Sequence, residues 1–464
     1  MKKKHLVIVG VIILSAIVIL GLYQTFALSS DITKDTSGYY NVTITDGTTI
    51  TVPAGSTKTV YYKLTNTNKG IVKYGVGYSG TNITVKYYTD TIDPVTGTVD
   101  YGKSKYIKLS VENTGTTSST ATLSTILGYE NGGDLIVPSG VTLVTEKKSP
   151  LSSYITNLYN NATKTAVINN SITYQYDTTH SLMKDIDGNI RYYGASPNNY
   201  IYFNCSDYSN QSASTCETWR IIGVFEGKVK LIRGSQIGTY AWDNKNTSTG
   251  AETAYGKNDW AEARLMKLLN PGYESKTTGG SLYYNAKSGN CYSGQSNATK
   301  ACNFTSTGIK NATTRNLISD TIYYLGGHNS FSVYPNQIYE KERGTTVYSG
   351  RPTEWTGKIA LAYPSDYGYA ADLGKCSQNL NNYNNSTCTS NNWMKAIVAP
   401  NYGWLLTPRS GIASNVWYVY SSGGVYYNSY VYNAYGVAPV LFLNSDANVK
   451  SGTGTSSDPY QISV

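Results

Sequence analysis

The amino-acid sequence predicts an α+β protein of 464 residues with three successive parts: an N-terminal transmembrane helix, an all-β sandwich and a mixed α+β domain. Three observations support this order. An apolar run follows the N-terminus, and residues 30–146 carry short alternating patterns but neither Cys nor Trp. All six Cys and all seven Trp follow residue 200, where helical patterns appear between strands.

Residues 1–29 are predicted to be a cytoplasmic stub and a membrane anchor. Lys2 to Lys4 precede the apolar run Leu6–Leu22, which spans about 26 Å as a helix. The longer segment 6–28 can cross the ~30 Å hydrocarbon layer. Lysines stay on the cytoplasmic side, so residues after about 29 are expected to be extracellular. A signal peptide cleaved near Ala27 is the alternative, and it yields a secreted protein.

The charge of the chain argues against nucleic-acid binding. The formal net charge of +9 falls to +6 when the three cytoplasmic lysines are set aside. Nucleic-acid binding needs Lys and Arg clustered on one face, and here the remaining charge is dispersed. The sequence therefore predicts no nucleic-acid partner.

Residues 30–146 are predicted to form a β-sandwich stalk. Alternating segments such as Thr59–Leu64 and Tyr106–Val111 are separated by Gly, Asn, Asp and Pro at intervals expected of such a fold. The phrases Val52–Gly55 and Val111–Gly115 resemble those of immunoglobulin-like stalk modules in bacterial surface proteins. The resemblance implies a spacer role.

A charged, proline-containing break at Glu146–Pro150 separates the sandwich from the rest of the chain. Residues 147–199 are predicted to form a connecting helix, with apolar residues at helical spacing over Leu151–Leu158, and a hairpin turning at Asp187-Gly188. Residues 200–464 are predicted to be the mixed α+β domain.

Within residues 200–464 the pattern predicts one clear hairpin and two helices. The hairpin joins Trp219–Phe225 to Val229–Arg233. The helices are expected at Trp260–Leu269, which ends at Asn-Pro-Gly, and at Thr313–Leu325, which ends at Gly-Gly.

The six cysteines fall into three pairs that are close in sequence, and each pair flanks a polar loop. They are Cys205 and Cys216, Cys291 and Cys302, and Cys376 and Cys388. Sequence alone allows other pairings, but short loops close easily and an exported protein meets an oxidising environment, so three local disulfides are expected. Zinc is a poorer explanation because the sequence lacks Cys-x-x-Cys and its three His are scattered.

A Tyr-rich segment lies near the C-terminus. From Tyr418 to Tyr435, seven of the eighteen residues are Tyr and most others are Ser, Gly or Asn, a composition typical of antibody combining loops. We therefore predict a ligand-binding surface. Its residues are Tyr418, Tyr420, Tyr426, Asn428, Tyr430, Tyr432, Asn433 and Tyr435. The alternative is an ordinary exposed hairpin in a chain that contains 45 Tyr and only 6 Phe.

Strand alternation assigns the side chains of this segment to two faces. The exposed face is expected to carry Tyr426, Asn428, Tyr430 and Tyr432, with Tyr418 and Tyr420 joining across the Gly423-Gly424 turn. The face nearer the core is expected to carry Val425, Tyr427, Ser429 and Val431. In the last strand, Val437, Leu441 and Leu443 are expected in the core.

Several phrases near the C-terminus resemble the end of a bacterial surface domain of uncharacterised function. They are Trp404–Ser410, Val416–Val419, Gly423-Gly424 and Gly436–Leu443. Over Cys205–Leu443 the layout is also similar to C-type-lectin-fold proteins, including the variable proteins of diversity-generating retroelements.

The lectin-like resemblance implies a domain that presents variable side chains near its C-terminus. The Tyr, Asn and Ser content of the segment has two explanations. One is mutagenesis of Asn codons by a retroelement, and the other is ordinary Tyr-rich sequence. The sequence departs from the family pattern at Ala438, where Arg is usual, and at Thr407–Arg409, where Arg-Ser-Pro is permuted. Salt bridges made by those arginines are therefore not carried over.

No catalytic, metal or cofactor site is predicted. The extracellular His180 and His328 lie outside any nucleophile motif. The Asp-rich stretch Asp185–Asn189 places its Gly wrongly for a calcium loop and is interpreted as a hairpin turn. Formylglycine-generating oxidases share the lectin-like fold but need a reactive Cys pair, whereas these cysteines are explained as loop bridges.

We interpret the chain as a bacterial, membrane-anchored surface protein, adhesin-like or receptor-like, that binds an unidentified protein or glycan and is not an enzyme. Two alternatives stay open. One is an exported enzyme acting on cell-wall or glycan material, which a cleft with carboxylates about 5–9.5 Å apart would favour. The other is a structural cell-envelope protein. A flat, exposed Tyr surface favours the binding protein.

The anchor yields a first prediction. If residues 6–28 form a retained helix, the mature protein stays in the membrane fraction and resists carbonate extraction, because removing the helix from lipid exposes its apolar surface. Fractionation followed by N-terminal sequencing checks this. A soluble form beginning near Leu28 would instead establish the cleaved signal peptide.

Overall fold

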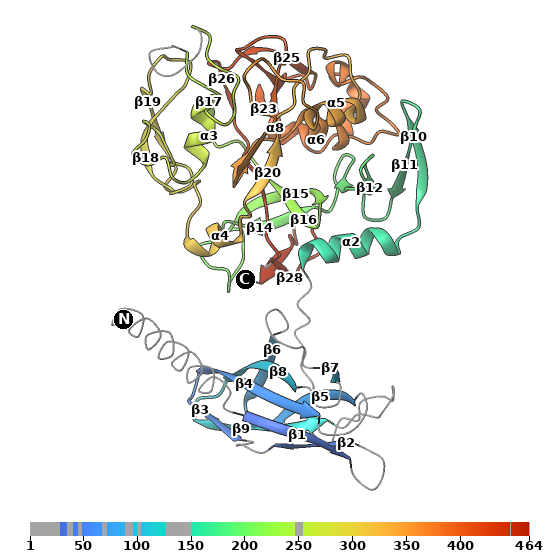
Figure 1. Ribbon diagram of the computed structural model, residues 1–464, viewed down its shortest axis with the longest axis vertical. Helices are drawn as coiled ribbons and strands as arrows, with labels where there is room; N and C mark the ends of the chain where they lie inside the picture. Colours follow the sequence, from blue (N-terminus) through green and yellow to red (C-terminus); the bar gives the residue numbers. More distant parts are fainter. Residues whose placement is uncertain are drawn as a thin grey trace, which may run out of the picture. The chain divides into compact units, whose positions relative to one another are not determined.

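The structure is a computed structural model that describes residues 28–34, 40–44, 49–66, 72–88, 96–99, 104–126, 150–245, 254–445 and 447–463. The chain divides into two compact units, Met1–Lys148 and Ser149–Val464, within the break indicated by the sequence (Figure 1). Of residues 1–29, predicted to be the stub and anchor, only Leu28 and Ser29 fall within these ranges, and both belong to a strand. In the same ranges no helix is long and apolar enough to cross a membrane.

The described part of the first unit is all strand and turn. Two sheets have the orders β2-β1-β4-β8-β6 and β3-β9-β5-β7. The strands are β1 (Leu28–Lys34), β2 (Tyr40–Ile44), β3 (Thr49–Val52), β4 (Thr57–Asn66), β5 (Val72–Ser79), β6 (Ile83–Tyr88), β7 (Thr96–Val99), β8 (Ser104–Asn113) and β9 (Ser119–Ile126). Val52 from one sheet and Val85 and Val111 from the other are fully buried, so apolar side chains of both sheets supply the interior.

The second unit is built on two larger sheets. The first has the order β10-β11-β12-β13-β15-β16-β27-β22, with β14 paired to β15. Its strands are β10 (Thr165–Asn169), β11 (Ile172–Asp177), β12 (Leu182–Lys184), β13 (Ile190–Tyr192), β14 (Tyr200–Phe203), β15 (Glu217–Phe225), β16 (Lys228–Arg233), β22 (Ile359–Ala360) and β27 (Val440–Phe442). The second has the order β17-β26-β23-β24-β25. Its strands are β17 (Thr239–Ala241), β23 (Gly403–Pro408), β24 (Asn415–Val419), β25 (Val425–Tyr430) and β26 (Ala434–Gly436).

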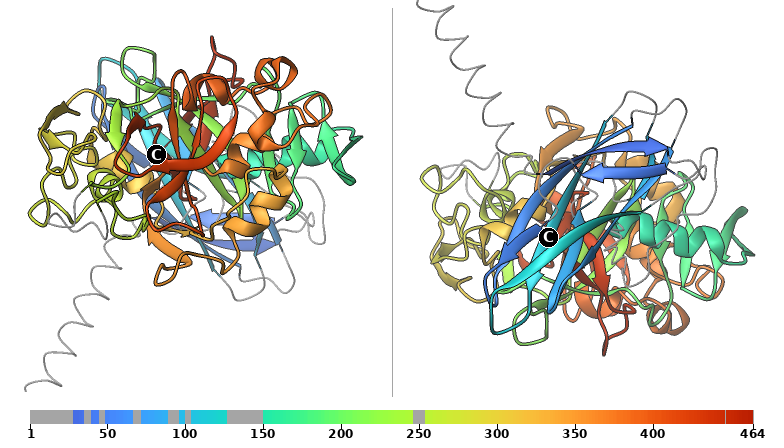
Figure 2. Two further views of the ribbon diagram at one scale, coloured as in Figure 1. Left: turned by 90° about the horizontal axis from the view of Figure 1, so that it is seen from above. Right: turned by 90° about the horizontal axis from the view of Figure 1, so that it is seen from below.

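Short helices and three two-stranded sheets complete this unit. The pairs are β18 (Ser288–Cys291) with β19 (Lys300–Asn303), β20 (Thr321–Tyr324) with β21 (Glu354–Gly357), and β28 (Asn448–Ser451) with β29 (Gln461–Ser463). The helices are α2 (Leu151–Asn161), α3 (Arg264–Leu269), α4 (Ala312–Leu317), α5 (Pro335–Glu342), α6 (Pro364–Tyr369), η2 (Leu380–Asn382), α7 (Ser386–Ser390) and α8 (Lys395–Val398). The β10–β11 and β18–β19 hairpins lie at opposite ends of the unit (Figures 1 and 2). Many strands with few helices make a β-rich α+β architecture.

Residues 150–199, which the sequence sets apart as a connector, pack within the second unit. Leu151 and Ile155 of α2 are fully buried in its core. The predicted hairpin at Asp187-Gly188 joins β12 to β13, and β13 pairs with β15 in the central sheet. Gly188 has a φ of 81°, the positive value that such a turn requires.

The predicted hairpin at 219–233 is confirmed, whereas both predicted helices were too long. β15 turns into β16 through Glu226 and Gly227, both with positive φ. Helix α3 begins at Arg264, four residues later than expected, because Ala263 is extended with ψ 142°. Helix α4 ends at Leu317, and the expected continuation to 325 was wrong because Thr-Ile-Tyr-Tyr forms β20 against β21. Its β-branched and aromatic residues fit a strand better than a helix.

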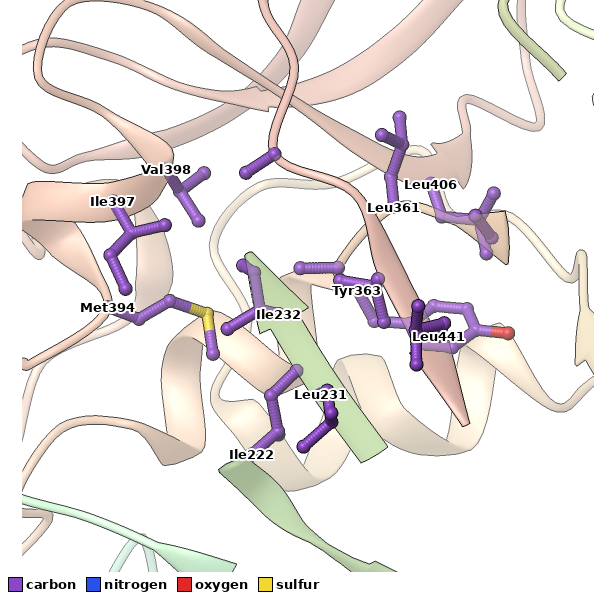
Figure 3. Close-up of a cluster of buried hydrophobic side chains, with 14 of the residues drawn as sticks. Ile222, Leu231, Ile232, Leu361, Tyr363, Met394, Ile397, Val398, Leu406 and Leu441 are labelled. Atoms are coloured by element: carbon purple, nitrogen blue, oxygen red, sulfur yellow. The ribbon is translucent and has the colours of Figure 1, made fainter. Parts of the chain in front are cut away.

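The main hydrophobic core lies between β15, β16, β27 and the chain around α8. Ile222 and Ile232 face Met394 and Val398 (Figure 3). Leu441 of β27 is fully buried. Val437 and Leu443 are also buried, in agreement with their assignment to the core from the sequence.

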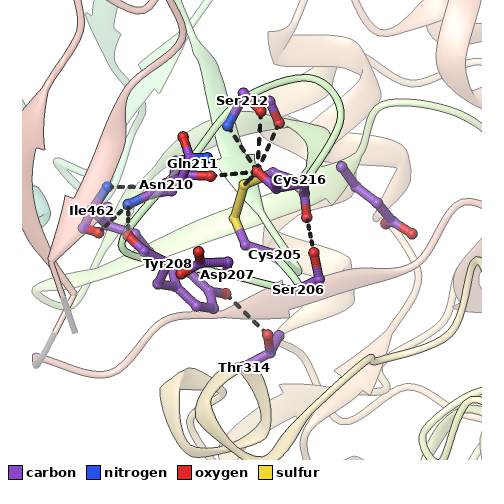
Figure 4. Close-up of a disulfide and its surroundings, with 12 residues drawn as sticks. Cys205, Ser206, Asp207, Tyr208, Asn210, Gln211, Ser212, Cys216, Thr314 and Ile462 are labelled. Atoms are coloured by element: carbon purple, nitrogen blue, oxygen red, sulfur yellow. Dashed lines mark hydrogen bonds between the residues drawn. A yellow bond between two sulfur atoms is a disulfide. The ribbon is translucent and has the colours of Figure 1, made fainter.

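All three expected disulfides are confirmed. The structure joins Cys205 to Cys216, Cys291 to Cys302 and Cys376 to Cys388, and no free cysteine occurs among the described residues. The first loop is also held by hydrogen bonds to distant elements (Figure 4). Within it, the Tyr208 hydroxyl lies 3.0 Å from Thr314 Oγ1, and Gln211 Nε2 donates to Ile462 O at 2.7 Å. The disulfide therefore closes a loop that connects α4 with β29.

Four buried charged side chains link the large sheet to helix α6. Arg191 Nε lies 2.6 Å from Asp185 Oδ2, and Arg191 Nη1 lies 2.9 Å from Asp366 Oδ1. Lys230 Nζ lies 2.5 Å from Asp366 Oδ2, and all four side chains are at most 1% exposed. Burial tends to raise the pKa of Asp366, but Lys230 and Arg191 outweigh it and hold that pKa below its ordinary value. Two cations and two carboxylates thus balance one another.

A second buried carboxylate, Glu342, ends helix α5 and contacts the beginning of α6. Its Oε1 accepts from Ser365 N at 2.9 Å, and its Oε2 accepts from Ser365 Oγ at 2.5 Å. Arg343 Nη1 lies 3.5 Å away. Burial raises the pKa of Glu342 to about 7 despite these partners. The folded state therefore retains this proton to a higher pH than an ordinary Glu does.

This raised pKa predicts that the second unit loses stability as pH rises from about 4.3, the ordinary Glu value, to 7. In that window the unfolded chain has released a proton that the folded chain retains. Glu342→Gln should make the free energy of unfolding less dependent on pH, and its slope should change by at most about 1.4 kcal/mol per pH unit. Urea unfolding monitored by Trp fluorescence measures it, because all seven Trp belong to this unit.

The exposed Glu340 of the same helix supplies the matched control. Glu340→Gln should retain the pH dependence of the unmodified protein. An unchanged slope in Glu342→Gln would show that this carboxyl does not titrate in the window.

Candidate recognition surface

The β25 and β26 end of the smaller sheet lies far from the point where the chain enters the second unit (Figure 1). At the entry, Pro150 forms a bridge with Asn448, and Leu151 N donates to Ala447 O at 2.9 Å. The first and last segments of the unit are therefore paired beside β28. The Tyr-rich strands face away from this attachment.

Strands β23 and β24 form the buried base of this surface. Every residue of both strands is buried. Trp404 Nε1 donates to Tyr240 O at 2.9 Å, and Trp242 Nε1 donates to Leu405 O at 3.2 Å. These bonds fix β23 to the chain around β17. The sheet is consequently held by its interior rather than by the exposed tyrosines.

Six rings from four neighbouring chain segments form what we call the aromatic platform. Its members are Tyr402, Trp404, Tyr418, Tyr420, Tyr426 and Tyr435. Tyr402 stacks on Tyr435 at 4.8 Å between centroids with an 18° interplanar angle, and Trp404 lies 4.5 Å from Tyr435. Tyr420 meets Tyr402 edge-on at 4.7 Å. Ring contacts of this kind stabilise a fixed arrangement.

Two platform tyrosines differ in exposure. Tyr418, predicted as a ligand contact, is only 7% exposed, and its hydroxyl donates to Asn428 Oδ1 at 3.0 Å. Burial raises the pKa of Tyr418. Tyr420 is 38% exposed. The Tyr418 ring therefore lies on the buried side of the platform, and its hydroxyl orients the exposed Asn428. The Tyr420 ring is in part exposed to solvent.

A second group, the tyrosine stack, lies at the other end of β25. It consists of Tyr255, Tyr430 and Tyr432. Tyr255 and Tyr430 are 4.5 Å apart with a 16° interplanar angle, and Lys245 Nζ lies 5.2 Å from the Tyr432 ring. The neighbouring Asn433 donates from Nδ2 to Ser429 Oγ at 2.9 Å.

A β-bulge explains why the predicted residues form two groups instead of one face. Val425, Ser429 and Val431 are buried, as alternation predicts. The β24–β25 register shifts between Val416 and Tyr418, which adds one residue to β25. A bulge bends its strand and increases the local twist. Tyr426 consequently joins the platform, while Tyr430 and Tyr432 join Tyr255.

Tyr427 lies beside the bulge and was expected on the core side. It is half-buried, and its ring lies 5.4 Å from Trp417, which is fully buried. Phe331 lies 5.2 Å from the same ring, and the Arg409 guanidinium lies 4.4 Å from it. This packing keeps Tyr427 apart from both exposed groups.

Helix α6 holds the turn between β24 and β25 in place through a hydrogen bond. The Tyr367 hydroxyl donates to Gly423 O at 3.0 Å. Gly423 has a φ of 104°, and a Cβ on Gly424 would lie 2.7 Å from Asn381 O. Both positions therefore favour glycine. The turn that carries Tyr420 and Tyr426 cannot move without disturbing buried neighbours.

Sequence reasoning missed three aromatic residues that complete these groups. Tyr402 and Trp404 come from the segment preceding and beginning β23, and Tyr255 comes from a loop far earlier in the chain. Only the Tyr402-x-Trp404 spacing, which puts both rings on one side of a strand, was a usable signal. Tyr255 gives no local signal.

The aromatic platform offers mainly uncharged groups to a ligand. Within the part of the chain that the structure describes, no charged side chain stacks on a platform ring. The hydroxyls of Tyr and the amide of Asn428 both donate and accept hydrogen bonds. In the same part, no group of three or more His, Cys, Asp and Glu is placed to hold a metal ion. A ligand could therefore stack on the rings and form hydrogen bonds with uncharged hydroxyl and amide groups.

The contrast between Tyr418 and Tyr420 gives a stability prediction. Tyr418→Ala should lower the free energy of unfolding by about 3 kcal/mol, because it empties a buried ring site. Tyr420→Ala should lower it by about 1 kcal/mol or less, because Tyr420 is 38% exposed and packs on other surface rings. Urea unfolding followed by Trp fluorescence provides both values. Equal losses would contradict the assignment of one ring to the interior and the other to the surface.

Comparison with protein-family models, curated proteins and solved structures finds no match to this chain. What the surface recognises must therefore be inferred from its own side chains.

Proposed function

We propose that this chain is a membrane-anchored surface protein whose second unit binds a protein or glycan ligand through the aromatic platform and the adjoining tyrosine stack. The observation that carries the proposal is the set of mutually stacked tyrosines at the end of the unit away from the chain entry, of which Tyr255, Tyr420 and Tyr430 are exposed. The N-terminus is cytoplasmic and residues after about 29 are extracellular in this proposal.

Exposed aromatic clusters have a cost that favours a functional explanation. Tyr420, Tyr430 and Tyr255 are 38%, 37% and 48% exposed, although ring surface is more stable when removed from water. These three rings lie outside the main hydrophobic core, whereas every residue of β23 and β24 is buried. Tyr is also the residue that contributes large contact area at low entropic cost. These features support a recognition surface.

The ordered base supports tight binding. A rigid surface loses little conformational freedom on association, so more of the contact energy appears as affinity. Buried contacts from Trp404, Tyr418 and Tyr367 fix the rings before any ligand arrives. In this respect the surface is closer to a matured antibody site than to a flexible loop.

The same proposal assigns a C-type-lectin-like fold to residues 200–464 and an immunoglobulin-like stalk to residues 30–146. The three loop disulfides and the late Tyr-rich hairpin support the first assignment. The two sheets of the first unit support the second. A spacer followed by a binding domain suits presentation at the cell surface, and no enzymatic role is proposed.

Binding to arrayed glycans and to cells, measured with Tyr420→Ala and Tyr430→Ala variants, tests the function. Each substitution should weaken binding by about 2 kcal/mol or more if its ring lies at the centre of the contact. Tyr348→Ala, a half-buried Tyr outside both groups, should bind as the unmodified protein does.

Thermal unfolding of the same variants separates binding from folding. Retained stability with lost binding supports the proposal. Undiminished binding in both variants, or an aromatic surface that only mediates association between copies of the chain, would refute it and would favour the structural envelope protein.

A further inference from the structure

Arg220 is a buried cation for which the described structure supplies no carboxylate partner. Arg220 lies on strand β15 and is only 7% exposed. Nε donates to Asn199 Oδ1 at 2.5 Å and Nη2 donates to Pro197 O at 3.4 Å, and both acceptors are neutral. The guanidinium lies 3.7 Å from the Tyr200 ring and 4.9 Å from the Trp393 ring.

Glu217, the acidic side chain that lines a cavity beside Arg220, is already paired with Arg233. Glu217 Oε2 lies 3.0 Å from Arg233 Nε and accepts from Trp219 Nε1 at 3.1 Å. Elsewhere in the unit, buried Arg191 and Lys230 share Asp366. Arg220 therefore contributes one unbalanced positive charge, and burial lowers its pKa to about 10.

Arg220 lines a cavity of about 380 Å³ between the ends of β14, β15 and β16 and helix α8. Small-molecule sites occupy about 300–1,000 Å³. The lining includes Tyr200, Arg220, Trp393 and Ala396, together with the ion pair Glu217–Arg233. The two rings cover the guanidinium faces, and Nη1 has no acceptor among the described residues. Its planar edge is thus the part available to a ligand.

We propose that this cavity binds a small carboxylate ligand, with Arg220 as the recognising residue. A buried charge without a partner is costly, and an incoming anion removes that cost. A planar carboxylate matches the guanidinium edge. One unbalanced positive charge suits a monoanion better than a phosphate dianion. The site is separate from the aromatic platform and does not depend on the function proposed for it.

Calorimetric titration of the full chain at low ionic strength tests the site with two carboxylates, N-acetylglycine and glucuronic acid. Their neutral counterparts are N-acetylglycine amide and glucose. At least one carboxylate should bind one to one, and its identity distinguishes a peptide carboxylate from a sugar acid. Arg220→Met should weaken that binding by about tenfold to a hundredfold.

A second variant tests the site even if Arg220→Met fails to fold. Ala396 is exposed on the rim, so Ala396→Glu places a carboxylate beside the cavity, with Ala396→Gln as its neutral control. The Glu variant should lose carboxylate binding and melt at a higher temperature than the Gln variant. Binding of neither carboxylate, binding that both Arg220→Met and Ala396→Glu retain, or tighter binding of inorganic phosphate would overturn the proposal.

Discussion

The architecture of the second unit depends on the buried ion pairs that connect Asp185, Arg191, Asp366 and Lys230. These pairs join the β12–β13 hairpin, the large sheet and helix α6, which are far apart in sequence. Removing one partner would leave a buried charge uncompensated and would cost about 3–5 kcal/mol. The network therefore specifies one position for α6. That position matters because the next residue, Tyr367, holds the turn at Gly423.

The position of α6 in turn fixes the hairpin that carries the candidate recognition surface. Tyr367 donates a hydrogen bond to the β24–β25 turn. The hairpin is built on the buried strands β23 and β24. Tyr402, Tyr420 and Tyr435 contact one another on this sheet. Trp404 and Tyr418 belong to the interior, Tyr402 and Tyr435 pack against it, and Tyr420 is exposed. The exposed side chains can therefore change with less effect on the fold than the buried ones, as the proposed recognition surface requires.

Local patterns predicted much of the fold, but long-range features escaped them. Short loops identified the three disulfides, and alternation identified β15, β16 and the buried residues of β25. The extended β20 was mistaken for helix because its apolar spacing fits both. The Tyr-rich segment indicated the candidate surface. Tyr255 and the β24–β25 bulge did not appear in the pattern, because both depend on contacts between separate segments of the chain. The ion pairs escaped prediction for the same reason.

The central claim is that the aromatic surface is formed before any ligand binds. Hydrogen exchange of backbone amides in β24 and β25, measured by mass spectrometry on the unliganded protein, tests it most directly. The account predicts that the paired amides of this hairpin, including Val419 and Val425, exchange as slowly as those of the buried strand β23. Exchange as fast as that of exposed loops would contradict the account, since the rings would then be ordered only by a ligand.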